Sequence, residues 1–184
     1  MKLWDFIYDH LADRQRVFLI VVIDTEGSSP GRVGFKMAVA EGGDFSGSIG
    51  GGIMEFNMVE LARKMYRENQ FEIIIRRQVH NPESEHDKSG MICSGEQTQV
   101  FIPLSSADFA TLTQLRQGID NGEKGIITIS NAGLCFAGNE SQEKQIISAF
   151  KDNNKWNYSE QIGLADTVYI FGAGHISVPL SQIL

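Results

Sequence analysis

The sequence predicts an α/β fold, with one mixed β-sheet domain and flanking helices. Two observations support this fold class. The run from Val17 to Ile23 is continuously apolar and rich in β-branched residues, as in a strand covered on both faces. The segments Met54 to Met65 and Phe109 to Ile119 instead repeat their apolar residues at helical spacing. The 184 residues are 42% hydrophobic, which is enough to build a core.

The first half of the chain divides into short elements. The apolar residues from Leu3 to Leu11 recur at helical spacing and predict an N-terminal helix. After the Val17 to Ile23 strand, Phe35 to Val39 alternates like a half-buried strand. Gly42-Gly43 then predicts a hairpin turn, and the return strand runs from Phe45 to Ile49. The helix that contains Met54 and Met65 follows this hairpin.

The second half repeats this alternation of strands, helices and a hairpin. We expect Ser106 to cap the helix at Phe109 to Ile119, because serine is favoured at that position. The segment Glu140 to Phe150 reads as a further helix, and Cys135 as a core residue. The predicted strands of this half are Phe71 to Val79, Gln97 to Ile102, Gly125 to Ser130 and Leu134 to Ala137.

The last stretch of the chain changes character. Residues 152–165 are mostly polar and read as a linker after a first domain at residues 1–151. Thr167 to Phe171 reads as a short strand, and Gly172-x-Gly174 follows it as at the start of a Rossmann-like domain. Residues 166–184 hold only the first strand and part of a helix of such a domain, and Ser177 stands where its third glycine is expected. NAD(P) binding by this truncated unit is therefore not expected.

Composition narrows the function classes. A net charge of −7 and a pI near 5.1 argue against general nucleic-acid binding. Asp5 and Asp9 interrupt the apolar N-terminus, which excludes a signal peptide. The apolar run at Val17 to Ile23 is too short to span a membrane. Two cysteines form no disulfide framework, so we expect a cytoplasmic protein.

The glycines are the most informative feature of the sequence. Nine of the 19 fall between Gly27 and Gly52, and seven of these form clusters at Gly27 to Gly34 and Gly47 to Gly52. The second cluster leads into a helix, so the backbone N–H groups from Gly50 to Ile53 could cradle a phosphate. Arg32 and Lys36 would then be nearby cations. No Gly-Lys-Ser/Thr follows, which argues against nucleotide hydrolysis. The alternative interpretation is two tight turns that bracket an ordinary hairpin.

Two further side chains allow a structural and a functional interpretation. Glu55 lies in the first turn of the predicted helix, where the helix dipole alone favours a carboxylate. It could equally bind N–H groups of a ligand at the rim of a glycine-rich pocket. Cys93 could be a buried small hydrophobe or a soft ligand for a soft metal. The four histidines show no zinc-ligand spacing with a cysteine and read as surface residues.

Taken in order, four motifs resemble the XdhC/CoxI family. They are Gly27 to Met37, Gly47 to Glu55, the Cys93 motif, and Phe171 to His175. Two positions depart from the family pattern: Cys93-Ser94-Gly95 stands where Cys-Gly-Gly is common, and Phe35 replaces a more usual alanine. The resemblance extends over almost the whole chain.

The resemblance implies an accessory protein that serves molybdenum hydroxylases such as xanthine dehydrogenase. Such a chaperone binds the molybdenum cofactor (molybdopterin) as cargo, protects it during sulfuration and passes it to the apoenzyme. Its implied partners are an apo molybdenum hydroxylase and a cysteine desulfurase-type sulfur donor, with Cys93 also a candidate metal ligand. An apolar strand edge in the truncated unit predicts a homo-oligomer. The implied cofactor-binding residues are Ser28, Ser29, Arg32, Lys36, Ser48, Gly50, Gly51, Gly52, Glu55 and Cys93.

Two other functions remain open from the sequence. The chain could be a fragment of an NAD(P)-dependent oxidoreductase whose second half is missing. It could also be a non-catalytic adaptor for a partner oxidoreductase, in which the glycines serve only turns.

Overall fold

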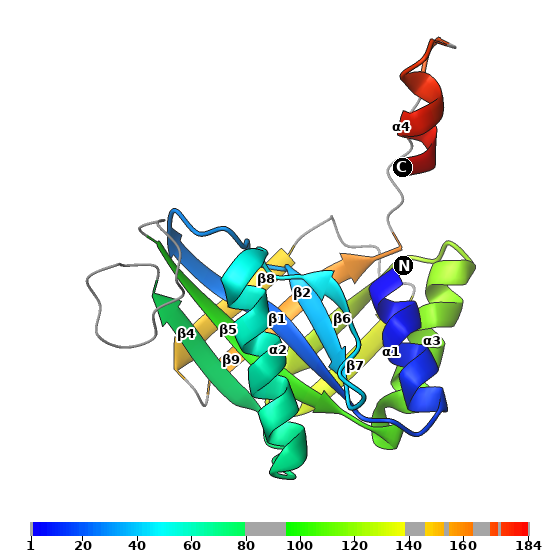
Figure 1. Ribbon diagram of the computed structural model, residues 1–184. Helices are drawn as coiled ribbons and strands as arrows, with labels where there is room; N and C mark the ends of the chain where they lie inside the picture. The colour runs from blue at the N-terminus through cyan, green and yellow to red at the C-terminus, as the bar shows by residue number, and fades with distance from the viewer. Residues whose placement is uncertain are drawn as a thin grey trace.

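The computed structural model describes residues 2–79, 95–138, 146–152, 155–163, 170–172 and 174–183. Within these ranges the strands form two sheets in which every pairing is antiparallel. Helices flank the sheets (Figure 1). The predicted α/β class with flanking helices is confirmed, whereas the single mixed sheet is replaced by two antiparallel sheets.

The first sheet has the strand order β3-β2-β1-β5-β4. Its central strand is β1, which pairs with β2 on one side and β5 on the other. That position explains the continuous apolar run of β1, because both of its faces are covered. The bounds are β1 Val17–Gly27, β2 Lys36–Ala40, β3 Phe45–Ser48, β4 Ile74–Val79 and β5 Gly95–Leu104.

The second sheet has the order β7-β6-β9-β8. A tight hairpin joins β6 to β7, and β9 lies between β6 and β8. The bounds are β6 Gly125–Ser130, β7 Gly133–Gly138, β8 Ile146–Asp152 and β9 Lys155–Ile162.

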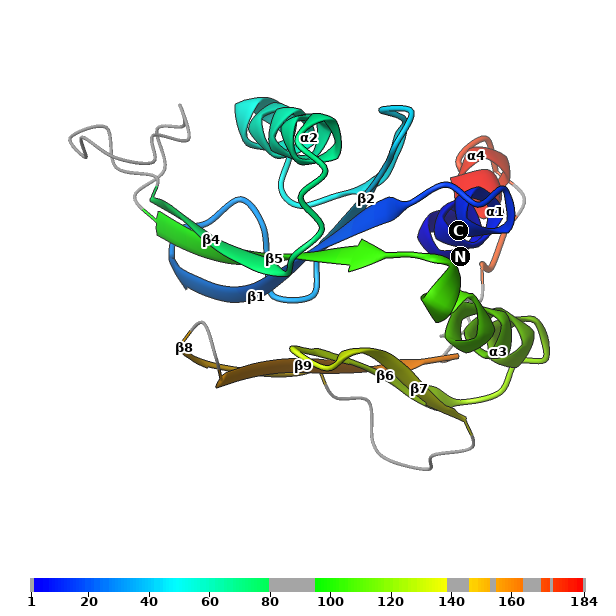
Figure 2. The same ribbon diagram turned by 90° about the horizontal axis from the view of Figure 1, so that it is seen from below.

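The elements stack in layers. Helix α2 (Gly52–Arg67) covers one face of the first sheet, and the second sheet lies against the other face (Figure 2). Helices α1 (Lys2–Ala12) and α3 (Phe109–Asp120) pack together at one end of the two sheets. A single turn of 3₁₀ helix, η1 (Ser106–Asp108), leads into α3.

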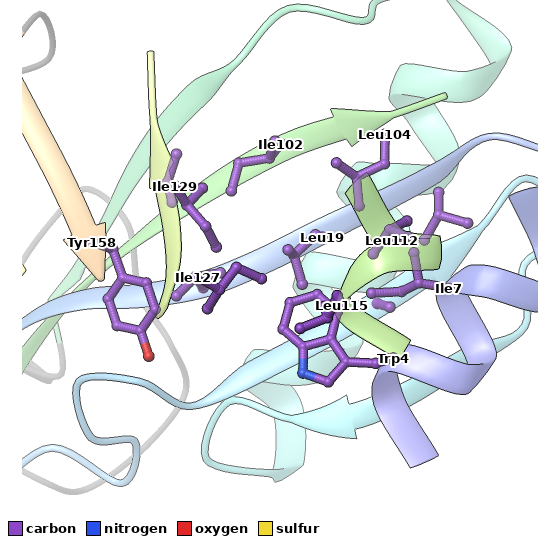
Figure 3. Close-up of a cluster of buried hydrophobic side chains, with 14 of the residues drawn as sticks. Trp4, Ile7, Leu19, Ile102, Leu104, Leu112, Leu115, Ile127, Ile129 and Tyr158 are labelled. Carbon is purple, nitrogen blue, oxygen red and sulfur yellow. The ribbon is translucent and has the colours of Figure 1, made fainter. Parts of the chain in front are cut away.

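Two apolar clusters fill the spaces between these layers. The larger one joins α1, α3 and both sheets through residues such as Trp4, Leu19 and Ile127 (Figure 3). The second lies between α2 and the first sheet and includes Phe18 and Met58. Alternate residues of β1 therefore point into different clusters, as the two-residue period of a strand requires.

Three expectations about local structure are wrong. Strand β2 is buried on both faces: Met37 and Val39 face α2, whereas Ala38 and Ala40 join the larger cluster. The described part of Glu140 to Phe150 belongs to strand β8, not to a helix. Ser106 does not cap α3 but begins η1, and the N-cap of η1 is Ser105, whose hydroxyl accepts the Ala107 N–H.

The polar segment expected as a linker contains an inner strand of the second sheet. In β9 the side chains of Trp156 and Tyr158 are buried in the larger cluster, while Asn157 between them is exposed. This two-residue period, not the average polarity, decides the structure. The first domain therefore extends to at least Ile162, rather than ending at residue 151.

The C-terminal residues include a short helix, α4 (Ser177–Ile183). Most of the expected strand Thr167 to Phe171 lies outside the described residues, and its last residue, Phe171, is 95% exposed. None of the helices in the described ranges has both the length and the apolar character needed to cross a lipid bilayer.

Candidate functional site

The two glycine clusters lie directly against each other. A Cβ atom added to Gly31 would lie 2.3 Å from the Ile49 carbonyl oxygen, and one added to Gly50 would lie 2.8 Å from the Gly31 nitrogen. Gly50 also has a φ of 130°, which side-chain-bearing residues rarely adopt. Glycine is therefore required at both positions, for close backbone approach and for conformation. We call residues 27–34 the first glycine loop and residues 47–52 the second.

A buried side chain joins the two loops. Gln97 on β5 is fully buried, and its Oε1 accepts hydrogen bonds from the Ser29 hydroxyl at 2.9 Å and the Gly31 N–H at 3.1 Å. Its Nε2 donates to the Ile49 carbonyl at 2.9 Å. One carboxamide thus contacts both loops, with its acceptor toward the first and its donor toward the second.

The Glu55 carboxylate accepts hydrogen bonds from backbone N–H groups just before α2. Its Oε1 accepts the N–H of Ile49 at 2.9 Å and that of Gly51 at 2.8 Å, together with the Ser48 hydroxyl. Gly51 is the N-cap residue of α2 and has no side chain with which to cap the helix. The chain's own carboxylate therefore fills part of the expected phosphate cradle. All of these hydrogen bonds reach Oε1, and Oε2 faces none of these donors.

The same contacts set the charge state of Glu55. Burial would raise the pKa of this carboxyl, but the hydrogen bonds from Ser48, Ile49, Gly51 and Gly50 together outweigh burial. The pKa of Glu55 consequently lies below its ordinary value. The group is a carboxylate at neutral pH, and Oε2 can accept a hydrogen bond from a ligand.

Lys36 faces away from the expected cradle. Its ammonium donates to the Gly34 carbonyl at 2.6 Å, to Glu160 at 2.7 Å and to the Tyr158 hydroxyl at 3.2 Å. Burial, and then the Glu160 charge, raise the pKa of Tyr158, so its hydroxyl stays protonated and donates to Glu160. The structure therefore gives Lys36 a role between the two sheets, contrary to the expectation that it would meet a phosphate.

Of the remaining predicted residues, three are described by the structure and one lies outside the described residues. Arg32 follows Gly31 directly and has an exposed side chain, while Gly52 begins α2 and is also exposed. Ser28 is exposed, and its carbonyl lies against Gly95, where an added Cβ would come within 2.3 Å. Cys93 lies outside the described residues, so its roles as cofactor and metal ligand remain predictions.

The motifs that form this contact are matched by a known family. The sequence profile of the XdhC and CoxI family matches residues 10–77, which contain both glycine loops, Glu55 and α2. Residues 10–77 therefore carry the sequence signature of the XdhC and CoxI family. A search of the curated proteins found no match.

A solved structure shares the fold of this chain. The chain resembles the crystal structure of a xanthine dehydrogenase from Bacillus halodurans, with a TM-score of 0.57 and 18% sequence identity. The similarity covers 86% of this chain and 52% of that chain, so the chain spans about half of the length of the solved protein. At this identity the likeness shows the fold alone.

Other candidate residues lie apart from the glycine loops. Cys135 on β7 is exposed, contrary to the expectation of a core position, because its neighbours Leu134 and Phe136 point to the buried face instead. Within the described ranges, no group of three or more His, Cys, Asp or Glu side chains could hold a metal ion. A pocket at the end of β1 contains none of the predicted site residues: Asp24, Thr25, Glu26, Arg77, Glu96 and Thr98 line it.

The sequence did not predict the role of three residues that organise this domain. Gln97 was expected only as the start of a strand, and Tyr158 and Glu160 only as part of a linker. A signal for β9 was present in the alternation of Trp156, Tyr158 and Ile162. For Gln97 no local signal existed, because its partners are 48 to 68 residues away in the sequence.

Proposed function

We propose that this chain binds the molybdenum cofactor and serves as an accessory protein in the maturation of a xanthine dehydrogenase-type molybdenum hydroxylase. The observation that supports this most directly is the contact between the two glycine loops, because the family motifs meet at one site. Two turns that merely bracketed a hairpin would not need a buried glutamine shared between them. The adaptor interpretation predicts no such organisation.

The proposed site has one acceptor and one set of donors. The Glu55 Oε2 would accept N–H groups from the pterin ring, since its Oε1 is already occupied. The N–H groups of Gly52 and Ile53 lie at the start of α2 and are not among those that bind Glu55. They would therefore bind the cofactor phosphate. The exposed Arg32 would add a cation at the same edge.

Three parts of the proposal concern residues or partners beyond these loops. Cys93 would meet the molybdenum or its sulfur; Gly95, two residues further along the chain, pairs with Gly27 of the first loop. A cysteine desulfurase-type donor would supply the sulfur, and the loaded protein would pass its cargo to the apoenzyme. We further propose that residues 166–184 begin a Rossmann-like domain and that the protein forms a homo-oligomer.

The test is an anaerobic titration of the protein with molybdenum cofactor released from a molybdenum enzyme, followed by cofactor absorption. We expect saturable binding with a stoichiometry of one cofactor per site. In Cys93→Ala, weaker retention of the cofactor would support the cysteine as a ligand, and unchanged retention would remove it from the site. Absence of binding by the unmodified protein would contradict the proposed function.

A further inference from the structure

Gln97 is a polar side chain in the buried interior of the first sheet. It is fully buried near the start of β5, between Thr25 on β1 and Gln78 on β4. A buried carboxamide destabilises a protein unless both its donor and its acceptor find partners. Here both do, and every partner belongs to a glycine loop. The contacts of Gln97 therefore concern the loops rather than the sheet.

The geometry around Gln97 depends on the neighbouring glycine. A Cβ atom at Gly31 would lie 2.4 Å from the Gln97 Oε1 and 2.3 Å from the Ile49 carbonyl oxygen. Only a residue without a side chain allows the amide of the first loop and the carbonyl of the second to reach the same carboxamide. The contact between the loops thus requires both Gly31 and Gln97. No local sequence pattern reveals that these two residues act together.

We propose that Gln97 is the positioning residue of the cofactor site. Its single carboxamide fixes the separation of the two glycine loops, so that the edge formed by Arg32, Gly52 and Glu55 is in place before a ligand arrives. A site that is ordered in advance loses less conformational entropy when it binds. The role in cofactor binding rests on the proposed function, whereas the coupling of the loops is a property of the chain alone.

The chain offers a matched control for this proposal. Gln99 lies two residues further along β5 and is equally buried, with its Nε2 donating to the Gln78 Oε1 at 2.7 Å and lying 3.8 Å from the Met54 sulfur. Neither of these partners belongs to a glycine loop, and the Gln99 Oε1 is buried without a hydrogen-bond partner. Substitution by leucine removes a buried carboxamide in both cases, but only at Gln97 does it release the loops.

The first experiment needs no cofactor. Amide hydrogen exchange is measured by NMR in the unmodified protein and in Gln97→Leu, Gln97→Met and Gln99→Leu. We expect both Gln97 variants to speed exchange at least tenfold in residues 27–34 and 47–52 together, and Gln99→Leu to change neither loop. The more adaptable methionine serves if the leucine variant does not fold. Faster exchange in one loop only, or equal effects of the Gln97 and Gln99 variants, would overturn the proposal.

The second experiment separates positioning from general stability. The dissociation constant for molybdenum cofactor is measured with the same variants at a temperature at which all are folded. We expect it to rise at least tenfold for the Gln97 variants and less than twofold for Gln99→Leu. Equal affinities for all variants would contradict a positioning role. If the unmodified protein binds no cofactor, the proposed function fails, while the exchange experiment still decides whether Gln97 couples the loops.

Discussion

The ammonium of Lys36 on β2 lies 2.7 Å from the carboxylate of Glu160 on β9. The two side chains are 11% and 13% exposed, so the pair is largely screened from solvent by the two sheets that it joins. Lys36 also donates to the carbonyl of Gly34, the last residue of the first glycine loop. The ion pair therefore links that loop to the second sheet.

Removal of one partner from this pair should destabilise the protein. We expect Glu160→Gln to lower the free energy of unfolding by about 3 kcal/mol, because it leaves a buried ammonium without its counter-charge. The matched control is Glu60→Gln, which breaks the exposed pair with Arg63 and should cost less than about 1 kcal/mol. Urea denaturation measures both, and equal losses would contradict the buried linkage.

A methyl group at Gly31 should disturb the contact between the loops. Gly31→Ala places a Cβ atom against the Ile49 carbonyl, which is backbone and cannot rotate away. We expect the free energy of unfolding to fall by about 1–3 kcal/mol. Gly42→Ala, at an open position of the β2–β3 turn, is the control and should be nearly neutral. Thermal and chemical denaturation of the two variants would show whether the loops touch as described.

The contribution of Glu55 to stability should depend on pH. Its pKa in the folded protein is below the ordinary value of 4.5, so the carboxylate stabilises the fold above that value and stops doing so as the pH falls through the folded pKa. Near neutral pH we expect Glu55→Gln to be less stable than the unmodified protein by about 1 kcal/mol. The difference should shrink as the pH falls below that ordinary value and through the lower folded pKa. Unfolding curves across this range test the prediction, and a constant difference would contradict it.

The exposure of Cys135 predicts a reactive thiol. In a Cys93→Ser background, we expect one thiol per folded chain to react with an aromatic disulfide reagent without denaturant. Cys135→Ser should change the free energy of unfolding by less than about 0.5 kcal/mol. A thiol that reacts only after unfolding would instead support the core position expected from sequence.

The sequence predicted those elements whose signal is local. The apolar run of β1, the helical stripe of α2 and the turn at Gly42-Gly43 all appear where they were expected. In β9, by contrast, Trp156 and Tyr158 are buried within a segment of mostly polar composition. Composition describes the average of a segment, whereas the fold is decided by which alternate positions face the core.

The sequence motifs named the two glycine loops as a candidate site, but they did not predict the contacts between the loops. The motifs identify the glycines and Glu55, but Glu55 could be read as a ligand of the cofactor or as a partner of its own backbone. The structure shows that its Oε1 binds backbone N–H groups of its own chain. Likewise, no spacing rule could assign Lys36 to Glu160, which lies 124 residues away. Contacts over such separations depend on the packing of the two sheets.

Hydrogen exchange of the unmodified protein with and without molybdenum cofactor tests the central claim most directly. Because the proposed site comprises both glycine loops and the first turn of α2, added cofactor should slow exchange in residues 27–34 and 47–55 together. Exchange in the β6–β7 hairpin, which lies in the second sheet, should stay unchanged. Cofactor binding that protects only segments outside these loops would contradict the account.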